Sequence, residues 1–160
     1  MTLNQEQIMN YFTRIGLNYD DYKCHKLDGQ LLAKLCFAHN ISIPFENLDI
    51  LNHKMISLDG SILYDKIITK HRGGLCFELN GLSEIFLRSL GFGVKDLSSR
   101  FFRDAGDDIP MQRHRLLKVE AVDGTYIWDI GIGQRSPKYP LRLAEGLVQK
   151  QCGEVYKLEK

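Results

Sequence analysis

The sequence is poor in several features that mark whole classes of protein. Its 160 residues contain only four cysteines, which are scattered along the chain and form no Cys-x-x-Cys pair. Thiols that are so few and so widely spaced exclude a disulfide framework and argue against a thiolate zinc site. We therefore expect free cysteines and no bound metal.

An excess of one charge and long hydrophobic runs are also lacking. Lys and Arg number 21 against 20 Asp and Glu, which gives a net charge of +1. A balanced chain of this kind offers no basic surface for nucleic acid or for an anionic membrane. The N-terminal segment MTLNQEQIMNYF has no signal-peptide pattern, and no apolar run reaches transmembrane length. We expect a cytoplasmic protein that binds neither nucleic acid nor membrane.

Helical spacing of apolar residues characterises residues 1–92. The capping and spacing signals predict helices that begin at Asn4 and near Asp28, and a further short helix over 62–68. Segment 41–50 is predicted to be extended, because a proline within it disfavours helical angles in the preceding residue.

The clearest predicted helix follows Gly73-Gly74 and ends at Gly91, a typical C-terminal stop. Its apolar residues are spaced by three or four positions and form one stripe, which predicts core packing along one face. The stripe consists of Leu75, Leu79, Leu82, Phe86 and Leu90.

Strand patterns replace helical ones from Val94 onward. The segment HRLLKVEAVDGTYIWDIGIG alternates apolar and polar residues on both sides of Asp123-Gly124, a strong hairpin signal. We therefore expect an α+β fold with a helical subdomain over 1–92 and a β subdomain over 93–160. The β subdomain is expected to form a sheet or a partial β-barrel.

The stretch HRGGLCFELN contains a candidate nucleophile, Cys76, in the first turn of the clearest helix. Free backbone N–H groups and the helix dipole favour an anion at such a position. Helix N-termini and nearby cations lower the pKa of thiols, and glycines allow close approach of backbone or substrate. On these residues alone, a nucleophilic thiol and a buried structural cysteine are equally open.

A nucleophilic thiol needs a base, and the base needs an orienting group. His114 opens one arm of the predicted hairpin and Asp129 lies on the other. With a loop at Asp123-Gly124, Asp129 faces Lys118, which points to the same side as His114. The offset of four residues is about 13 Å, so contact requires a bulge, strong twist or another register. Structural or surface roles are expected for the other histidines: His25, His39, His53 and His71.

Three motifs together resemble those of the arylamine N-acetyltransferase (N-hydroxyarylamine O-acetyltransferase) family. The nucleophile motif RGGxCxEhN is present as RGGLCFELN, the helical-domain motif as IPFENLD, and the aspartate motif V-D-V-G-F-G as WDIGIG. The separations between Cys76, His114 and Asp129 also agree with this family. Because the motifs span most of the chain, the resemblance is far more specific than any one of them.

The resemblance implies a fold related to papain-like cysteine enzymes and a Cys-His-Asp triad that transfers acetyl groups in a ping-pong reaction. Cys76 would attack the thioester of acetyl-CoA, His114 would take the thiol proton, and Asp129 would orient the imidazole. The acceptor would be an arylamine, an arylhydrazine or an N-hydroxyarylamine, as in xenobiotic metabolism. Acetyl-CoA would be a cosubstrate, and no bound cofactor is expected.

Supporting residues also follow from the resemblance. Arg72 and Glu46 resemble an ion pair that braces the nucleophile loop, with ordinary surface charges as the alternative. Asn80 is expected to form hydrogen bonds near the site.

The acceptor pocket is expected to include Phe45, Gly131 and Ile132, with a plain core role as the alternative for Phe45. Ile132 replaces a common phenylalanine and cannot stack on an aromatic ring, which leaves the acceptor preference open.

The family continues into a third domain that covers the cleft and helps to bind coenzyme A. Since the sequence ends with GEVYKLEK about where that domain would begin, we expect the lid and part of the donor site to be absent. Uncovered surface would favour self-association and would expose the site to water. Two alternatives are a thiol hydrolase acting on aryl esters and a catalytically inactive fragment that serves as a folding or interaction module.

Overall fold

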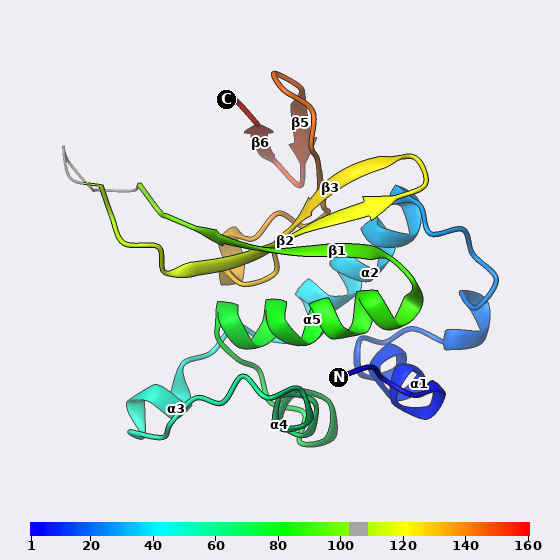
Figure 1. Cartoon of the computed structure of the whole chain (residues 1–160), viewed down its shortest axis with the longest axis vertical. Helices are drawn as coiled ribbons and strands as arrows, with labels where there is room; N and C mark the ends of the chain where they lie inside the picture. Colours follow the sequence, from blue (N-terminus) through cyan, green and yellow to red (C-terminus); the bar gives the residue numbers. More distant parts are fainter. Residues whose placement is uncertain (103–108) are drawn as a thin grey trace.

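Helices precede strands along the chain, and the two kinds of element pack on each other (Figure 1). The computed structural model describes residues 1–102 and 109–160. Its helices are α1 (Gln5–Arg14), α2 (Gly29–Ser42), α3 (Leu48–Leu51), α4 (Gly60–Tyr64) and α5 (Cys76–Leu90), with a π-helical segment η2 (Asp65–Thr69) directly after α4. Its strands are β1 (Gly93–Ser99), β2 (His114–Ala121), β3 (Gly124–Trp128), β4 (Leu141–Arg142), β5 (Val148–Gln151) and β6 (Glu154–Lys157).

Side-chain caps start the first two helices where the sequence predicted them. Asn4 Oδ1 accepts a hydrogen bond of 2.8 Å from the N–H of Gln7, and Gln7 Oε1 accepts one of 3.0 Å from the N–H of Asn4. Asp28 accepts a bond of 2.9 Å from the N–H of Leu31 and so begins α2. The predicted capping signals are confirmed.

The extended segment predicted for 41–50 is confirmed only in its central part. Helix α2 continues to Ser42 and ends there because Ile43, which precedes a proline, adopts extended angles. Glu46 then accepts a hydrogen bond of 2.7 Å from the N–H of Leu48, where α3 begins. The prediction of strand-like backbone beyond residue 47 was therefore wrong.

Helix α5 lies at the centre of the molecule, with the sheet on one side of it and α1 and α4 on the other (Figure 1). It begins directly after Leu75 and ends at Gly91, whose φ of 102° allows the left-handed stop that the sequence predicted. The prediction of one apolar stripe was too narrow, because α5 also buries Ser83 and Leu87. The cause is contact on two sides: α1 and α4 cover one side of α5, and β1 and β2 cover the other.

The strands form open sheets, and no closed barrel occurs within residues 1–102 and 109–160. The main antiparallel sheet has the order β1-β2-β3-β4, and a separate hairpin of β5 and β6 projects from the body of the molecule (Figure 1). Of the two predicted forms of the β part, the structure shows the open sheet. Leu32 and Leu79, which precede residue 92, belong to the same hydrophobic core as Trp128, which follows it. The subdomain boundary at residue 92 stays a prediction.

The hairpin register differs by two residues from the predicted one. Ala121 pairs with Gly124 and Leu117 with Trp128, so the loop is 122–123. Extending this register places the residue after Trp128 opposite Leu116, about 7 Å along the strand from His114 rather than about 13 Å. A shift of two residues preserves the face of the sheet to which each side chain points. It also halves the offset along the strand between His114 and Asp129.

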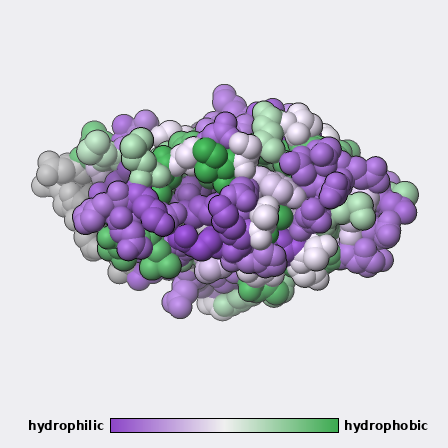
Figure 2. All heavy atoms as spheres, turned by 90° about the horizontal axis from the view of Figure 1, so that it is seen from below, coloured by the Kyte–Doolittle hydropathy of each residue, from purple (hydrophilic) through white to green (hydrophobic). Residues whose placement is uncertain are grey.

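The surface is mostly hydrophilic where α1, α3 and α4 lie, and its apolar residues form small separate groups (Figure 2). Within the described parts of the chain, no helix has both the length and the apolar character that a membrane crossing requires.

His39 has a structural position inside the fold, one of the two roles expected for it from the sequence. Its side chain is buried, and its Nδ1 atom lies 3.0 Å from the hydroxyl of Tyr11. Burial disfavours the charged ring and lowers the pKa of His39 to about 3. The imidazole is therefore neutral in the folded protein.

We predict that His39 makes the protein sensitive to acid. Below the unfolded pKa of about 6.5, the unfolded chain gains a proton that the folded chain does not, so the free energy of unfolding falls by about 1.4 kcal/mol per pH unit. This loss continues until the pH reaches the folded value of about 3. The free energy of unfolding, measured with urea between pH 7 and pH 4, should depend less steeply on pH in His39→Gln than in the wild type. His25→Gln, at an exposed position, is the control, and equal slopes for all three proteins would contradict the prediction.

Candidate active site

The predicted histidine and aspartate are in direct contact. His114 is the first residue of β2, and Asp129 directly follows β3. Nε2 of His114 lies 2.7 Å from Oδ2 of Asp129, and their side chains are only 2% and 6% exposed. The paired strands therefore bring together two residues that are 15 positions apart in the sequence.

Cys76 approaches the same histidine from the start of α5. The thiol acts on the His114 ring together with Asp129, and since Nε2 faces Asp129, Nδ1 is the nitrogen left for the sulfur. Burial opposes a charged ring and is the largest single effect, but the hydrogen bonds and charges of Asp129 and Cys76 together outweigh it. They raise the pKa of His114 to about 9. The geometry thus favours an imidazolium beside the sulfur at neutral pH.

Asn80 connects the nucleophile helix to the aspartate. It lies one turn after Cys76, and its Nδ2 atom donates to the backbone oxygen of Arg115 at 2.6 Å and to Oδ1 of Asp129 at 3.2 Å. Its Oδ1 atom accepts from the N–H of Ile130 at 3.3 Å. These bonds reach across to β2 and to the segment after β3, so the prediction of hydrogen bonds near the site describes only part of what Asn80 does.

A cleft of about 540 Å³ lies beside the segment that follows Asp129, and Cys76, His114 and Asp129 are not part of its lining. Phe45 and Ile132 line it, whereas Gly131 does not. Two cations that the sequence analysis did not single out, Arg135 and Lys138, also lie in its wall. The full lining is Asn40, Ile43, Pro44, Phe45, Ile130, Ile132, Gly133, Gln134, Arg135 and Lys138.

Comparison with known proteins agrees with this geometry. Residues 28–160 match the family model described as N-acetyltransferase. The chain belongs to the arylamine N-acetyltransferase family.

Relatives in this family are about two fifths identical to the chain over the aligned residues. The arylamine N-acetyltransferase / N-hydroxyarylamine O-acetyltransferase of Salmonella typhimurium is 42% identical over 129 residues, which are 81% of this chain and 46% of the relative. The Escherichia coli arylamine N-acetyltransferase is 39% identical over 149 residues, or 93% of this chain and 52% of the relative. The chain therefore spans about half the length of the curated relatives it matches.

Solved structures of the family have the same fold as this chain. The Salmonella typhimurium enzyme superimposes with a TM-score of 0.89 at 37% identity, covering 98% of this chain and 56% of that one. A Mycobacterium marinum arylamine N-acetyltransferase in complex with CoA gives 0.85 at 34% identity and covers 96% and 56%.

The glycines of the nucleophile motif make room for another part of the chain. A side chain on Gly73 would place its Cβ atom 2.0 Å from the backbone oxygen of Pro44. Gly74 pairs with Phe45, and the N–H of Glu46 donates to the Gly74 oxygen at 3.0 Å. The sequence allowed close approach of backbone or substrate at these glycines, and the structure shows close approach of backbone, from the IPFENLD segment.

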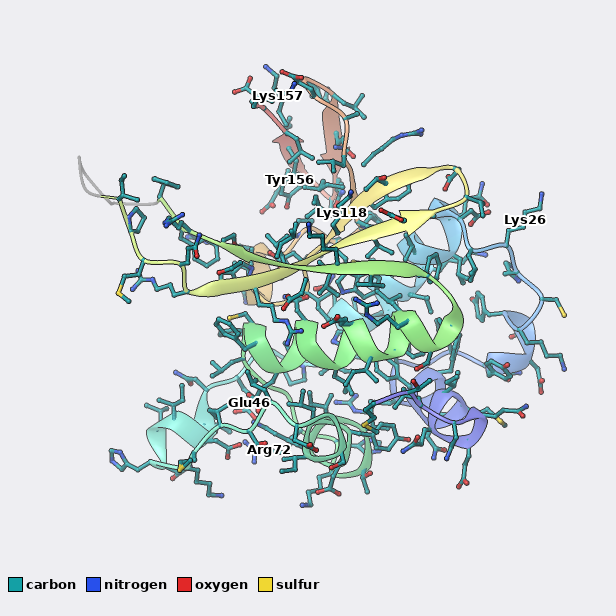
Figure 3. The ribbon with its side chains drawn as sticks, in the orientation of Figure 1. Lys26, Glu46, Arg72, Lys118, Tyr156 and Lys157 are labelled. Carbon is teal, nitrogen blue, oxygen red and sulfur yellow. The ribbon has the colours of Figure 1, made fainter. Side chains whose placement is uncertain are left out.

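An ion-pair network lies behind the nucleophile helix. Glu46 and Arg72 point toward each other below α5, with Nη2 of Arg72 2.6 Å from Oε1 of Glu46 (Figure 3). Arg72 also contacts Asp49 at 3.1 Å, and Lys66 joins Asp49 to Glu78 with two contacts of 2.7 Å. Sequence reasoning missed Asp49, Lys66 and Glu78. Glu78 stands inside the nucleophile motif, but no spacing signal connects it to the other two.

We predict that Asp129 holds the proton on His114 up to high pH. NMR titration should give His114 a pKa of about 9 in the wild type, and Asp129→Asn should move it toward the ordinary value of about 6.5. The raised pKa also stabilises the fold below about pH 6.5, a contribution that is lost as the pH rises through about 9. An unchanged titration in Asp129→Asn would refute this role, and the exposed His25 serves as the reference signal in the same spectra.

We predict that Gly131→Ala disturbs the nucleophile rather than the cleft. The added Cβ atom would lie 2.7 Å from both Cα and Cβ of Cys76, and backbone cannot yield as a flexible side chain does. Overpacking of this kind costs about 1–3 kcal/mol. Thermal unfolding should show the loss, together with slower alkylation of Cys76. At Gly93, the control, an added Cβ meets the flexible side chain of Glu120 at 3.1 Å, and Gly93→Ala should be tolerated. Equal effects at both glycines would contradict the prediction.

Proposed function

We propose that the chain transfers an acetyl group from acetyl-CoA to an arylamine, an arylhydrazine or an N-hydroxyarylamine in a ping-pong reaction. The observation that carries this proposal is the line of contacts from Cys76 through His114 to Asp129, with His114 and Asp129 2.7 Å apart. Membership of the arylamine N-acetyltransferase family supports the reaction class. The matched Mycobacterium marinum structure in complex with CoA supports acetyl-CoA as the cosubstrate.

In the first half-reaction, the Cys76 sulfur attacks the carbonyl carbon of the acetyl thioester. His114 holds the proton that the thiol has given up, so the attacking atom is a thiolate. The new carbon–sulfur bond forms as the bond to the coenzyme A sulfur breaks. His114 then gives its proton to the departing coenzyme A thiolate, which leaves acetyl-Cys76 and a neutral imidazole.

In the second half-reaction, the amine nitrogen attacks the carbonyl carbon of acetyl-Cys76. His114, now neutral, accepts the proton that the nitrogen loses, and the Cys76 sulfur leaves as a thiolate. Asp129 keeps the imidazole in one orientation and stabilises its charged form in both halves. The cycle ends with the acetylated amine and with the thiolate–imidazolium pair restored.

The cleft offers a place for the aromatic acceptor. Phe45 and Ile132 supply apolar surface next to the segments that contact Cys76, and the side chain of Phe45 is 43% exposed. An aryl ring packs well on such surface, whereas Ile132 cannot stack on it as a phenylalanine would. We propose that Phe45 and Ile132 bind the acceptor. Gly131, by contrast, acts through its close approach to Cys76.

The test is the intact mass of the protein after brief mixing with acetyl-CoA or, separately, with 4-nitrophenyl acetate, which needs no coenzyme A site. We expect the chain to gain one acetyl group, and peptide mapping should place it on Cys76. Cys76→Ser should gain none there, and His114→Gln should gain it more slowly by about 10²–10⁴-fold, the usual contribution of a general base. An arylamine added afterwards should remove the group and appear as its acetyl derivative.

Two results would contradict the proposal. Failure of both donors to label Cys76 would show that the sulfur is not a nucleophile. Loss of the acetyl group at the same rate with and without an arylamine would instead indicate a thiol hydrolase.

A further inference from the structure

A lysine is enclosed by two carboxylates on the helical side of the nucleophile. Nζ of Lys66 lies 2.7 Å from Oδ2 of Asp49 and 2.7 Å from Oε1 of Glu78, and the Lys66 side chain is only 13% exposed. Burial opposes its charge, but the two carboxylates outweigh that effect and raise the pKa of Lys66. Lys66 belongs to the π-helical segment η2, a wide helical turn that is frequent at functional sites.

Glu78 holds the backbone directly before the nucleophile. Its Oε2 atom accepts a hydrogen bond of 2.9 Å from the N–H of Leu75, and its side chain is 3% exposed. A carboxylate in the first turn of a helix satisfies free N–H groups and interacts favourably with the dipole. Glu78 therefore acts as the side-chain cap of α5.

The same carboxylate stands in the helical turn that begins with the sulfur, which has to become negative. Glu78 follows Cys76 by two residues, which advances the helix by about 3 Å and turns it by about 200°, so the two side chains leave the helix in nearly opposite directions and their charges interact across its first turn. A buried carboxylate without a partner disfavours a second negative charge nearby. The start of α5 thus has two conflicting requirements: the cap needs the charge of Glu78, and the thiolate is disfavoured by it.

We propose that Lys66 is a positioning residue that reconciles the two requirements. By pairing with Glu78 it keeps the cap in place and cancels the negative charge that Cys76 would otherwise experience. Lys66 contacts no reacting atom in this role. The inference rests on the proposed function of Cys76 as the nucleophile.

The other charges around the site do not replace Lys66. On the sheet side, Cys76 faces His114, with Asp129 behind it. Arg115 donates to the backbone oxygen of Phe77 at 3.4 Å, but its charge is shared between Glu84 and Asp96.

On the helical side, the two partners of Lys66 differ in what else they contact. Asp49 has Arg72 at 3.1 Å and the exposed Lys54 at 3.9 Å, so it remains paired without Lys66. Glu78 pairs with Lys66 alone within the described part of the chain. Removal of Lys66 therefore leaves Glu78 uncompensated.

The test compares the alkylation of cysteines by iodoacetamide at several pH values in the wild type and in Lys66→Met. Peptide mapping separates Cys76 from the exposed Cys24 and Cys152, which act as references in the same sample. We expect the rate at Cys76 relative to Cys152 to fall by up to about tenfold, most strongly at the lower pH values, where less of the thiol is ionised. The cause is the negative charge of Glu78, which is no longer cancelled.

The double variant Lys66→Met/Glu78→Gln separates charge from structure. It removes both members of the pair, and the glutamine oxygen still accepts from the N–H of Leu75. We expect its rate at Cys76 to return to within about threefold of the wild type, since the net charge of the pair is the same. The matched control is Lys70→Met, which removes a lysine from the exposed pair with Asp65 and should leave the profile unchanged.

A Lys66→Met profile equal to that of the wild type would overturn the inference, and so would a double variant as slow as the single one. If Lys66→Met does not fold, Glu78→Gln alone decides: Cys76 should react at least as fast as in the wild type, and slower reaction overturns the inference. A fast wild-type Cys76 with an unchanged Lys66→Met variant refutes only the role of Lys66. A wild-type Cys76 that reacts no faster than Cys152 refutes the nucleophile and the inference together.

Discussion

The burial of α5 between helices and sheet is the constraint on which the rest of the structure depends. A helix covered on both sides has no solvent to satisfy its polar side chains, so each of them needs a partner from a neighbouring layer. Cys76 starts this helix, and the sheet therefore reaches it with His114 and Asp129. The three charged residues of α5, Glu78, Glu84 and Arg88, are all paired.

Helical geometry distributes these partners between the two layers. Residues two positions apart point in nearly opposite directions, because each residue turns the helix by about 100°. Glu78 and Asn80 are such a pair: Glu78 contacts Lys66 on the helical side, and Asn80 contacts Asp129 on the sheet side. The nucleophile stands just before both. Its surroundings are thus held from two directions by two residues of its own helix.

The sheet side of the site could largely be predicted from the sequence. Strand parity already placed His114 and Asp129 on one face, and the aspartate and nucleophile motifs named the residues. The register could not be predicted from the hairpin alone, since contacts outside it fix the turn. Asp123 accepts a hydrogen bond of 2.9 Å from the N–H of Gly29, and the N–H of Val122 donates to the oxygen of Leu27 at 2.9 Å. These bonds tie residues 122 and 123 to the start of α2.

The helical side of the site was only partly predictable, for a different physical reason. A strand or helix repeats its geometry, so spacing in the sequence reports on contact in space. Asp49 lies in the four-residue helix α3 and Lys66 in the five-residue segment η2, and both are too short for a period to connect these residues to each other or to Glu78. Motifs therefore identify the atoms that react, because the chemistry restricts those residue types. The charges that surround the reacting atoms can come from any nearby segment, and only the folded structure shows which segment supplies them.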